Sequence, residues 1–166
     1  MARAHFVKKA QKNHPGGIKK GDSYYWWAFM QGGRGGPKHY SKTQPRMSQL
    51  TQSEFMGQVY SFAEALEDLS KSEPSAVSSE RDSIADDIEA LGQEQEDKKS
   101  NMPDGLQEGD TGQLLEGRAS SCQEWAEELR GVDVPDEKDE GESDEEFQAR
   151  IDEAVEALQA CEYQGE

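Results

Sequence analysis

The sequence predicts an α+β fold, in which a small antiparallel β-hairpin or three-stranded module at the N-terminus precedes acidic α-helical hairpins or a thin bundle. Residues 22–29 contain five aromatic side chains and lead into a glycine-rich segment, which is typical of a hairpin. After residue 50, apolar residues recur at spacings of three and four, which is the helical period. The stripes are narrow, which favours thin helical packing over a deep core.

Composition and charge support this division. Of the 166 residues, 33% are hydrophobic and 32% are charged, a balance that favours elongated helices over a compact enzyme. Residues 1–50 contain ten Lys or Arg and one acid, a net charge of +9; because the whole chain carries −17, the remainder carries −26. A basic region attracts phosphates or acidic surfaces, whereas an acidic region repels nucleic acid or imitates it.

The sequence predicts a soluble intracellular protein without a membrane partner. No apolar run approaches the roughly 20 residues that cross a bilayer, and the N-terminus lacks the apolar region of a signal peptide. Cys122 and Cys161 form no CxxC motif, so we expect buried thiols in a reducing cytoplasm.

Residues 1–47 are expected to form a basic, aromatic β module. Residues 18–20 are a candidate for a short edge strand. In the hairpin, strand alternation should place one set of side chains on one side (Tyr24, Trp26, Ala28, Met30) and a second set on the other (Tyr25, Trp27, Phe29). One side can pack on the helices; because a lone hairpin is marginal in water, the other side should meet a third strand, a helix or a partner.

The turn of this hairpin is expected in the glycine-rich segment. Glycine tolerates positive φ, and four glycines surround Arg34, which we place at the tip of the turn: Gly32, Gly33, Gly35 and Gly36.

Residues 48–100 are expected to form a helical hairpin with coiled-coil seams. Thr51 to Glu54 has the pattern of a capping box that begins a helix. Pro74 suits the first turn of a second helix, which extends to about residue 99. The spacings 4, 3, 4 and 3 in the first helix are those of an oligomer seam: Phe55, Val59, Phe62, Leu66 and Leu69. Such a seam favours a homodimer, although the pattern leaves open whether the helices pack within or between chains.

Residues 101–166 are expected to form an acidic helical region. A turn segment over 101–110 precedes a helix over 111–130, and residues 131–143 form a flexible acidic linker. Ser143 to Glu146 is a second capping box. The helix that it begins repeats the 4, 3, 4, 3 spacing with Phe147, Ile151, Ala154, Leu158 and Cys161.

The basic module with its interleaved aromatics is the candidate functional site. Lys and Arg neutralise phosphates, and exposed Tyr or Trp stacks on unpaired bases. The alternative is that the aromatics form the core of the module and the lysines only keep it soluble. The candidate nucleic-acid-binding residues are Lys8, Lys9, Lys19, Lys20, Tyr25, Trp27, Arg34, Lys38 and Lys42.

Catalytic and metal-binding patterns are weak, so we expect no enzyme, no cofactor and no bound metal. His5, His14 and His39 lack the close spacing of a zinc site. The acidic run 136–146 departs from the EF-hand pattern. No catalytic signature is present, and a chain with so little core is poorly suited to hold a preorganised catalytic site.

Two resemblances add to these expectations. GDSYYWWAFMQGGRGGPKHYSKT resembles the three-stranded arm module at the start of tyrosine recombinases. The segment covers 23 of the 166 residues, about a seventh of the chain, and because the catalytic domain is absent it implies DNA binding only. The segments KKGDSYYWW, SKTQPRMSQLTQSEF and NMPDGLQEGDTGQLLEGRASSCQEWAEELRGVD together resemble accessory proteins of tailed bacteriophages. That resemblance implies a phage protein in the cytoplasm of a bacterial host, or in the virion, and no residue roles.

Two functional hypotheses follow. In the first, a non-catalytic phage accessory protein binds DNA or RNA through the basic module, and its acidic helices mediate self-association or limit non-specific binding. In the second, the helices are the working part, and the protein is a virion component, an assembly factor or an inhibitor of host defence that binds a phage or host protein. A DNA mimic is a variant of the second, although the acids are densest in the linker rather than on a rigid face.

Overall fold

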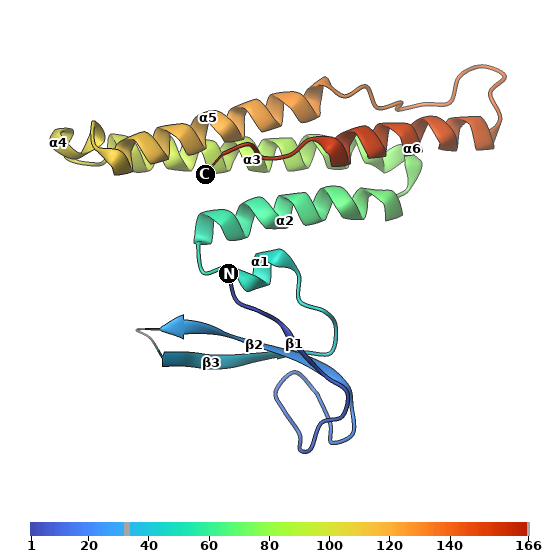
Figure 1. Ribbon diagram of the computed structural model, residues 1–166. Helices are drawn as coiled ribbons and strands as arrows, with labels where there is room; N and C mark the ends of the chain where they lie inside the picture. Colours follow the sequence, from blue (N-terminus) through green and yellow to red (C-terminus); the bar gives the residue numbers. More distant parts are fainter. Residues whose placement is uncertain (32–33, 166) are drawn as a thin grey trace. The chain divides into compact units, whose positions relative to one another are not determined.

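A computed structural model describes residues 1–31 and 34–165 of the chain and confirms the α+β fold (Figure 1). The residues form two compact units, Met1–Ser61 and Phe62–Glu166. The first contains a three-stranded antiparallel sheet, and the second is helical. The boundary between the units falls inside one helix, α2 (Glu54–Asp68).

The sheet of the first unit has the order β1-β2-β3, with strands β1 (His5–Val7), β2 (Tyr24–Gln31) and β3 (Arg34–Ser41). The expected edge strand at residues 18–20 is therefore wrong, because the third strand comes from His5–Val7, with His5 opposite Trp26 and Val7 opposite Tyr24. Ile18 instead is buried and forms an isolated bridge with His14.

A β-bulge interrupts the ladder between β2 and β3. Ala28 lies opposite Lys38 and Met30 opposite Gly35, so Phe29 faces two residues of β3, one of which is Pro37. Proline has no N–H to donate to a ladder, which is why it is accommodated at a bulge. The bulge disturbs the strict alternation of sides that the sequence predicts for this end of β2.

The expectation that Gly35 and Gly36 belong to the turn is wrong, because both lie in β3 and neither has a positive φ. Arg34 pairs with Gln31 in the ladder rather than standing at the tip of a turn. Gly32 and Gly33, on which part of that expectation rests, lie outside the described residues, and the structure does not describe the Arg34 side chain.

The connection between β1 and β2 is a folded loop, residues 8–23. The backbone N–H of Ala10 donates to Asp22 O at 2.8 Å, and that of Gly21 donates to Ala10 O at 2.9 Å. Ala10, Ile18 and Tyr24 form a small buried core, against which Val7, Trp26 and Tyr40 pack. Gly16 and Gly17 turn the loop with φ of 77° and 72°, a region that other residues rarely adopt.

Helix α1 (Met47–Leu50) precedes α2, and it changes where α2 begins. The predicted cap at Thr51 is wrong, because the chain leaves α1 extended there, with φ −103° and ψ 152°. Ser53 caps α2 instead: its hydroxyl accepts from the backbone N–H of Met56 at 3.3 Å. The Thr51 hydroxyl accepts from the Ser53 N–H at 3.2 Å and so supports the cap from outside the helix.

The predicted seam lies along α2 and the short 3₁₀ helix η1 (Leu69–Lys71) that follows it. Phe62 is partly buried, and four members are less than 9% exposed within the single chain: Phe55, Val59, Leu66 and Leu69. Dimerisation through these residues stays a prediction.

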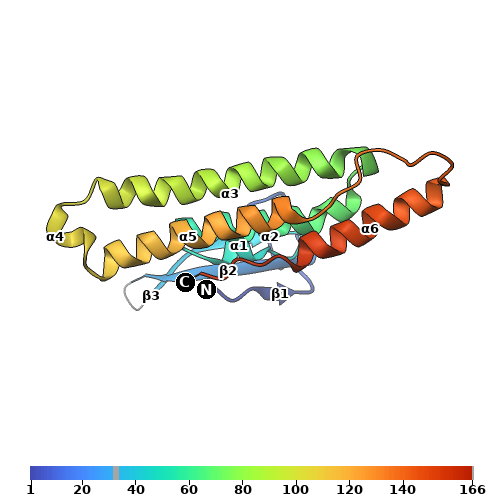
Figure 2. The same ribbon diagram turned by 90° about the horizontal axis from the view of Figure 1, so that it is seen from above.

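The second unit is built around a helical hairpin of α3 (Val77–Ser100) and α5 (Asp110–Gly131), which run side by side (Figures 1 and 2). The 3₁₀ helix η2 (Pro74–Ala76) leads into α3, and α4 (Asp104–Gln107) connects it to α5. The hairpin thus joins two helices that the sequence assigns to separate regions. Its buried side chains include Val77, Ile88, Leu91, Leu115, Cys122, Trp125 and Leu129.

Ion pairs and one close approach set the register of this hairpin. Arg130 Nη2 donates to Asp86 at 2.6 Å and to Glu89 at 2.8 Å, and Lys99 pairs with Glu116 at 2.9 Å. The hydrogen bonds to Asp86 and then to Glu89 raise the pKa of Arg130. At the α4–α5 connection, a Cβ on Gly112 would lie 1.9 Å from the Gln107 carbonyl oxygen, so only glycine fits there.

The last helix, α6 (Asp144–Ala160), begins at the predicted capping box, which is confirmed. The Ser143 hydroxyl accepts from Glu146 N–H at 3.2 Å, and the Glu146 carboxylate accepts from Ser143 N–H at 2.9 Å. The Ser143 N–H, and then the Ser143 hydroxyl, which lies 2.8 Å from the same carboxylate oxygen, lower the pKa of the Glu146 carboxyl. The Trp125 indole N–H donates to Cys161 O at 3.1 Å and so joins α5 to the end of α6.

The acidic segment 132–143 has no regular secondary structure, and it is paired with α6. Arg150 contacts Asp139 at 2.5 Å and Glu142 at 3.1 Å, and Lys138 contacts Asp144 at 2.7 Å. Among the described helices, none is both long enough and apolar enough to cross a membrane.

Candidate nucleic-acid interface

The β1–β2 loop displays lysines on an ordered backbone. Five of them are exposed: Lys8, Lys9, Lys12, Lys19 and Lys20. The Lys20 N–H donates to Asn13 Oδ1 at 2.8 Å, and the Lys19 N–H donates to Asp22 Oδ2 at 3.0 Å. The positions of the charges are therefore set by backbone hydrogen bonds, while the ammonium groups remain in solvent.

Asp22 is the one acid of this loop, and its carboxylate already interacts with the Lys19 N–H and with Lys42. The Lys19 N–H, and secondarily Lys42 at 3.4 Å, lower the pKa of the Asp22 carboxyl below its usual value. Lys42 is thus partly neutralised, whereas Lys8, Lys9, Lys12 and Lys20 make no ion pair within the described part of the chain. These four are the cations of the loop that are available to an anionic ligand.

The loop packs on the same side of the sheet as Trp26, a surface that we call the Trp26 face. Its core residues Ala10 and Ile18 contact Tyr24, Trp26 and Tyr40. Residues directly opposite each other in antiparallel strands share a side, so His5 and Tyr40, which flank Trp26, also belong to the Trp26 face. The lysine-bearing loop and the partly exposed Trp26 ring therefore lie on the same side of the sheet.

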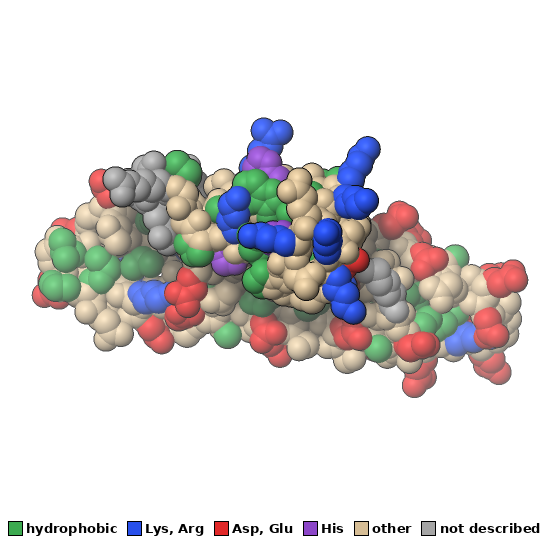
Figure 3. Space-filling model, turned by 90° about the horizontal axis from the view of Figure 1, so that it is seen from below, with side chains coloured by type: hydrophobic (Ala, Val, Ile, Leu, Met, Phe, Trp, Pro, Cys, Tyr) green, Lys and Arg blue, Asp and Glu red, His purple; other side chains and the backbone are tan. Residues whose placement is uncertain are grey.

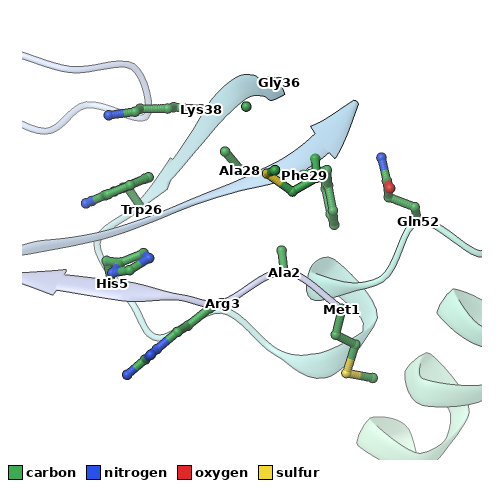
Figure 4. A pocket seen from close by; sticks show the side chains of 12 residues that line it. Met1, Ala2, Arg3, His5, Trp26, Ala28, Phe29, Gly36, Lys38 and Gln52 are labelled. Atoms are coloured by element: carbon green, nitrogen blue, oxygen red, sulfur yellow. The ribbon is translucent and has the colours of Figure 1, made fainter. Parts of the chain in front are cut away.

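Trp26 lies between two cationic or polar neighbours on this face (Figure 4). The His5 imidazole stacks on the indole with centroids 4.5 Å apart and planes at 16°. Lys38 Nζ lies 4.1 Å from the centroid of the Trp26 ring, which is a cation–π contact. The ring is therefore held in place from both neighbouring strands and remains partly exposed.

Beyond Trp26, toward the bulge, the Trp26 face opens into a groove of about 670 Å³ (Figure 4). Its floor consists of small residues of β2 and β3, Ala28, Gly35 and Gly36, and Lys38 lies at its edge. The segment from Met1 to Arg3 and Gln52 also line it. A hollow with an apolar floor and basic edges suits a ligand that combines a flat apolar group with negative charge.

The two aromatics that the sequence analysis selects lie on the opposite side of the sheet. Trp27 is only 6% exposed and stacks on His39 at 5.5 Å and 17°, so its selection for base stacking is wrong. Sequence alternation could not tell which side would be covered. Tyr25 is partly exposed and lies 5.0 Å from Phe6, which is 54% exposed.

The predicted lysines are at the surface, as an interface requires. Those selected from the sequence are all exposed: Lys8, Lys9, Lys19, Lys20, Lys38 and Lys42. The side chain of Arg34 lies outside the described part of the structure. Lys12, Arg3, His5 and Trp26 were missed; Lys12 belongs to the same basic run, and the other three become candidates only once β1 is known to pair with β2.

All three histidines take part in aromatic clusters. His5 stacks on Trp26, His14 stacks on Tyr40 at 4.7 Å, and His39 stacks on Trp27. Within the described residues, no group of three or more His, Cys, Asp or Glu side chains is arranged to hold a metal ion.

Charge separates sharply between the units. Met1–Ser61 contains ten basic and two acidic residues, a net charge of +8, and the remaining residues contain eight basic and 33 acidic ones, a net charge of −25. Figure 3 shows Lys and Arg side chains projecting around histidine and hydrophobic side chains. Positive charge next to exposed aromatic surface is the pattern of nucleic-acid-binding proteins.

Comparisons of the chain with protein-family models, with curated proteins and with solved structures find no match. What this surface binds is therefore inferred from its chemistry. Exposed ammonium groups bind phosphates, and a groove beside an aromatic ring accepts a flat apolar group.

Proposed function

We propose that the protein binds nucleic acid without catalysing a reaction, and that the Trp26 face and the lysines of the β1–β2 loop are its binding surface. One observation carries the proposal: an ordered loop presents five exposed lysines on the side of the sheet that also presents Trp26, His5 and Lys38. A loop that only improved solubility would not need to be folded around a core.

The distribution of the aromatic residues supports the same proposal. Tyr24 and Trp27 are buried and belong to the core of the unit, at 8% and 6% exposure. Trp26 and Tyr25 are partly exposed, and Phe6 is 54% exposed. The module thus has both a core and an aromatic surface, so the core interpretation of the aromatics accounts for only part of them.

The acidic second unit is proposed to modulate this binding. Its net charge of −25 opposes the +8 of the first unit, so it repels nucleic acid and competes with phosphates for the loop lysines. Self-association through the seam of α2 is a second proposed role of the helices, and it requires the seam to repack, because four of its five members are buried within the single chain. The resemblance to phage accessory proteins is the reason to propose phage or host DNA or RNA in the bacterial cytoplasm as the ligand.

Salt dependence tests the proposed function. Fluorescence anisotropy of labelled single- and double-stranded DNA with the full chain should show binding that weakens as salt rises. In the variant Lys9→Gln/Lys20→Gln, the slope of log K against log salt should fall by roughly 0.7 to 0.9 for each lysine. The control Lys98→Gln/Lys138→Gln makes the same change of net charge in the second unit.

The proposal is overturned if DNA and RNA both fail to bind at low salt, or if the control pair weakens binding as much as the loop pair does. The second candidate function is protein binding. It is favoured by two exposed leucines of the helical unit, Leu106 and Leu114, at 57% and 38%. A stable oligomer or protein complex that is indifferent to nucleic acid, seen by light scattering coupled to size exclusion, would favour it.

A further inference from the structure

We propose that the groove on the Trp26 face receives an unpaired base, so that the protein prefers a single nucleic-acid strand to a duplex. This inference rests on the proposed function and adds to it the form of the ligand. The groove lies entirely within Met1–Ser61, where its lining residues belong to the sheet, to the N-terminal segment and to the turn before α2.

The groove forms over β2 and β3 because the residues of its floor have little or no side chain. Ala28, Gly35 and Gly36 lie where the bulge separates β2 from β3. A Cβ added at Gly35 would have no atom within 4 Å, so this position faces open space. The volume of about 670 Å³ is in the range of sites that enclose small ligands.

The walls of the groove suit an aromatic ring. Met1 and Met30 supply thioethers, which are polarizable and make favourable contacts with aromatic rings. Met30 is 69% exposed although it is large and apolar. A base that lies on the floor would cover this surface, which water covers otherwise.

Trp26 serves as the end wall of the groove rather than as a free stacking platform. His5 stacks on the Trp26 ring and Lys38 lies over that ring. A base therefore cannot stack on Trp26 without displacing one of these two side chains. Lys38 has an exposed, flexible side chain. The Lys38 ammonium group can leave the Trp26 indole and form an ion pair with a phosphate instead.

The lysines of the β1–β2 loop extend the binding site along the length of β2, away from the groove. The β1–β2 loop packs at the Tyr24 end of the Trp26 face, and the groove opens at the other end, beyond Trp26. A single strand can place phosphates along the loop and one base in the groove. A duplex offers the same phosphates, but its bases are stacked and paired, so the groove would stay empty.

Filling the groove tests the inference. The variant Gly35→Leu puts an aliphatic side chain into the hollow without changing charge, and Ala28→Leu is a second filling variant on the opposite strand. Gly117→Leu is the control, because a Cβ there also has no atom within 4 Å but lies on α5. The probes are an oligothymidylate of about 12 nucleotides, which is within the usual site size, and a duplex of the same length.

The full-length protein should bind the oligothymidylate about tenfold more tightly than the duplex at the same salt concentration. Each filling variant should lose about fivefold to tenfold for the single strand and keep its duplex affinity. The control should change neither affinity. Far-UV circular dichroism establishes that the variants keep their fold.

Equal affinity for both probes, or filling variants that bind the single strand as well as the natural chain does, would overturn the inference and leave the proposed function standing. A protein that binds neither probe at low salt would overturn both. A larger loss for the duplex than for the single strand would assign the groove to duplex binding and would also contradict the inference.

Discussion

The imidazole of His5 stacks on the indole of Trp26 with ring centroids 4.5 Å apart and planes at 16°. The two residues lie directly opposite each other on β1 and β2. Because β1 has only three residues, it forms few ladder hydrogen bonds, and this ring contact adds to its attachment to the sheet, together with the Phe6–Tyr25 contact and the packing of Val7.

Replacing His5 tests that attachment. His5→Ala should destabilise the Met1–Ser61 unit by about 1 kcal/mol, the usual worth of an aromatic pair. His5→Phe should keep most of the stability, because it preserves a ring over Trp26. Urea unfolding followed by tryptophan fluorescence measures both. If His5→Ala unfolds at the same urea concentration as the natural chain, the stack does not hold β1.

Two glycines of α5 should respond in opposite ways to substitution by alanine. A Cβ on Gly112 would lie 1.9 Å from the Gln107 carbonyl oxygen, so Gly112→Ala must shift the backbone and should cost about 1 to 3 kcal/mol. A Cβ on Gly117 meets nothing within 4 Å, so Gly117→Ala should gain up to about 1 kcal/mol from helix propensity. Thermal unfolding of both variants checks the signs, and a loss at Gly117 would contradict the prediction.

The predictable parts of this fold are those that local chemistry determines. The cap of α6 needs only Ser143 and Glu146, three residues apart, and the predicted hydrogen bonds are present. The predicted cap of α2 at Thr51 was wrong because two hydroxyls, those of Thr51 and Ser53, are both candidates for the N-cap. The extended backbone at Thr51 favours Ser53. The local sequence pattern does not predict the short helix α1, which precedes Thr51 and shifts the N-cap of α2 to Ser53.

The parts that the sequence did not predict depend on long-range contacts. Strand β1 is three residues long and pairs with residues about twenty positions away. Without β1, both sides of the hairpin look equally aromatic, so the pattern cannot show that Trp27 is buried while Trp26 remains partly exposed. The partner of α3 is α5 rather than the nearer helix α2; an apolar stripe shows that a helix is packed but not against what.

Cys122 should make stability depend on pH in the alkaline range. It is fully buried, and burial raises the pKa of its thiol from 9.0 to about 11. Between these values the unfolded chain loses the proton and the folded chain keeps it, so stability falls as pH rises. The decrease should reach about 2 kcal/mol by pH 11. Urea unfolding at several pH values should show a shallower decrease for Cys122→Ala, even if that variant is less stable throughout.

Neutralising acids of the second unit should strengthen nucleic-acid binding. Glu124, Glu153 and Glu156 are exposed and form no ion pair within the described residues. The triple Glu→Gln variant should bind about twofold to tenfold more tightly at low salt, because less negative charge opposes the phosphates. Near 1 M salt, where charges are screened beyond about 3 Å, the difference should vanish. A difference that persists at high salt would point to a contact rather than to long-range repulsion.

The folded loop between β1 and β2 also has a consequence for proteolysis. Trypsin cleaves after lysine but must draw the chain into an extended form, and this lysine-rich segment is tied together by hydrogen bonds between Ala10, Gly21 and Asp22. We expect cleavage there to require opening of the loop, and at protease concentrations where the loop recloses faster than it is cut, the cleavage rate measures the equilibrium of that opening. The hydrogen bonds that position the charges therefore also protect the most basic segment of the chain from digestion.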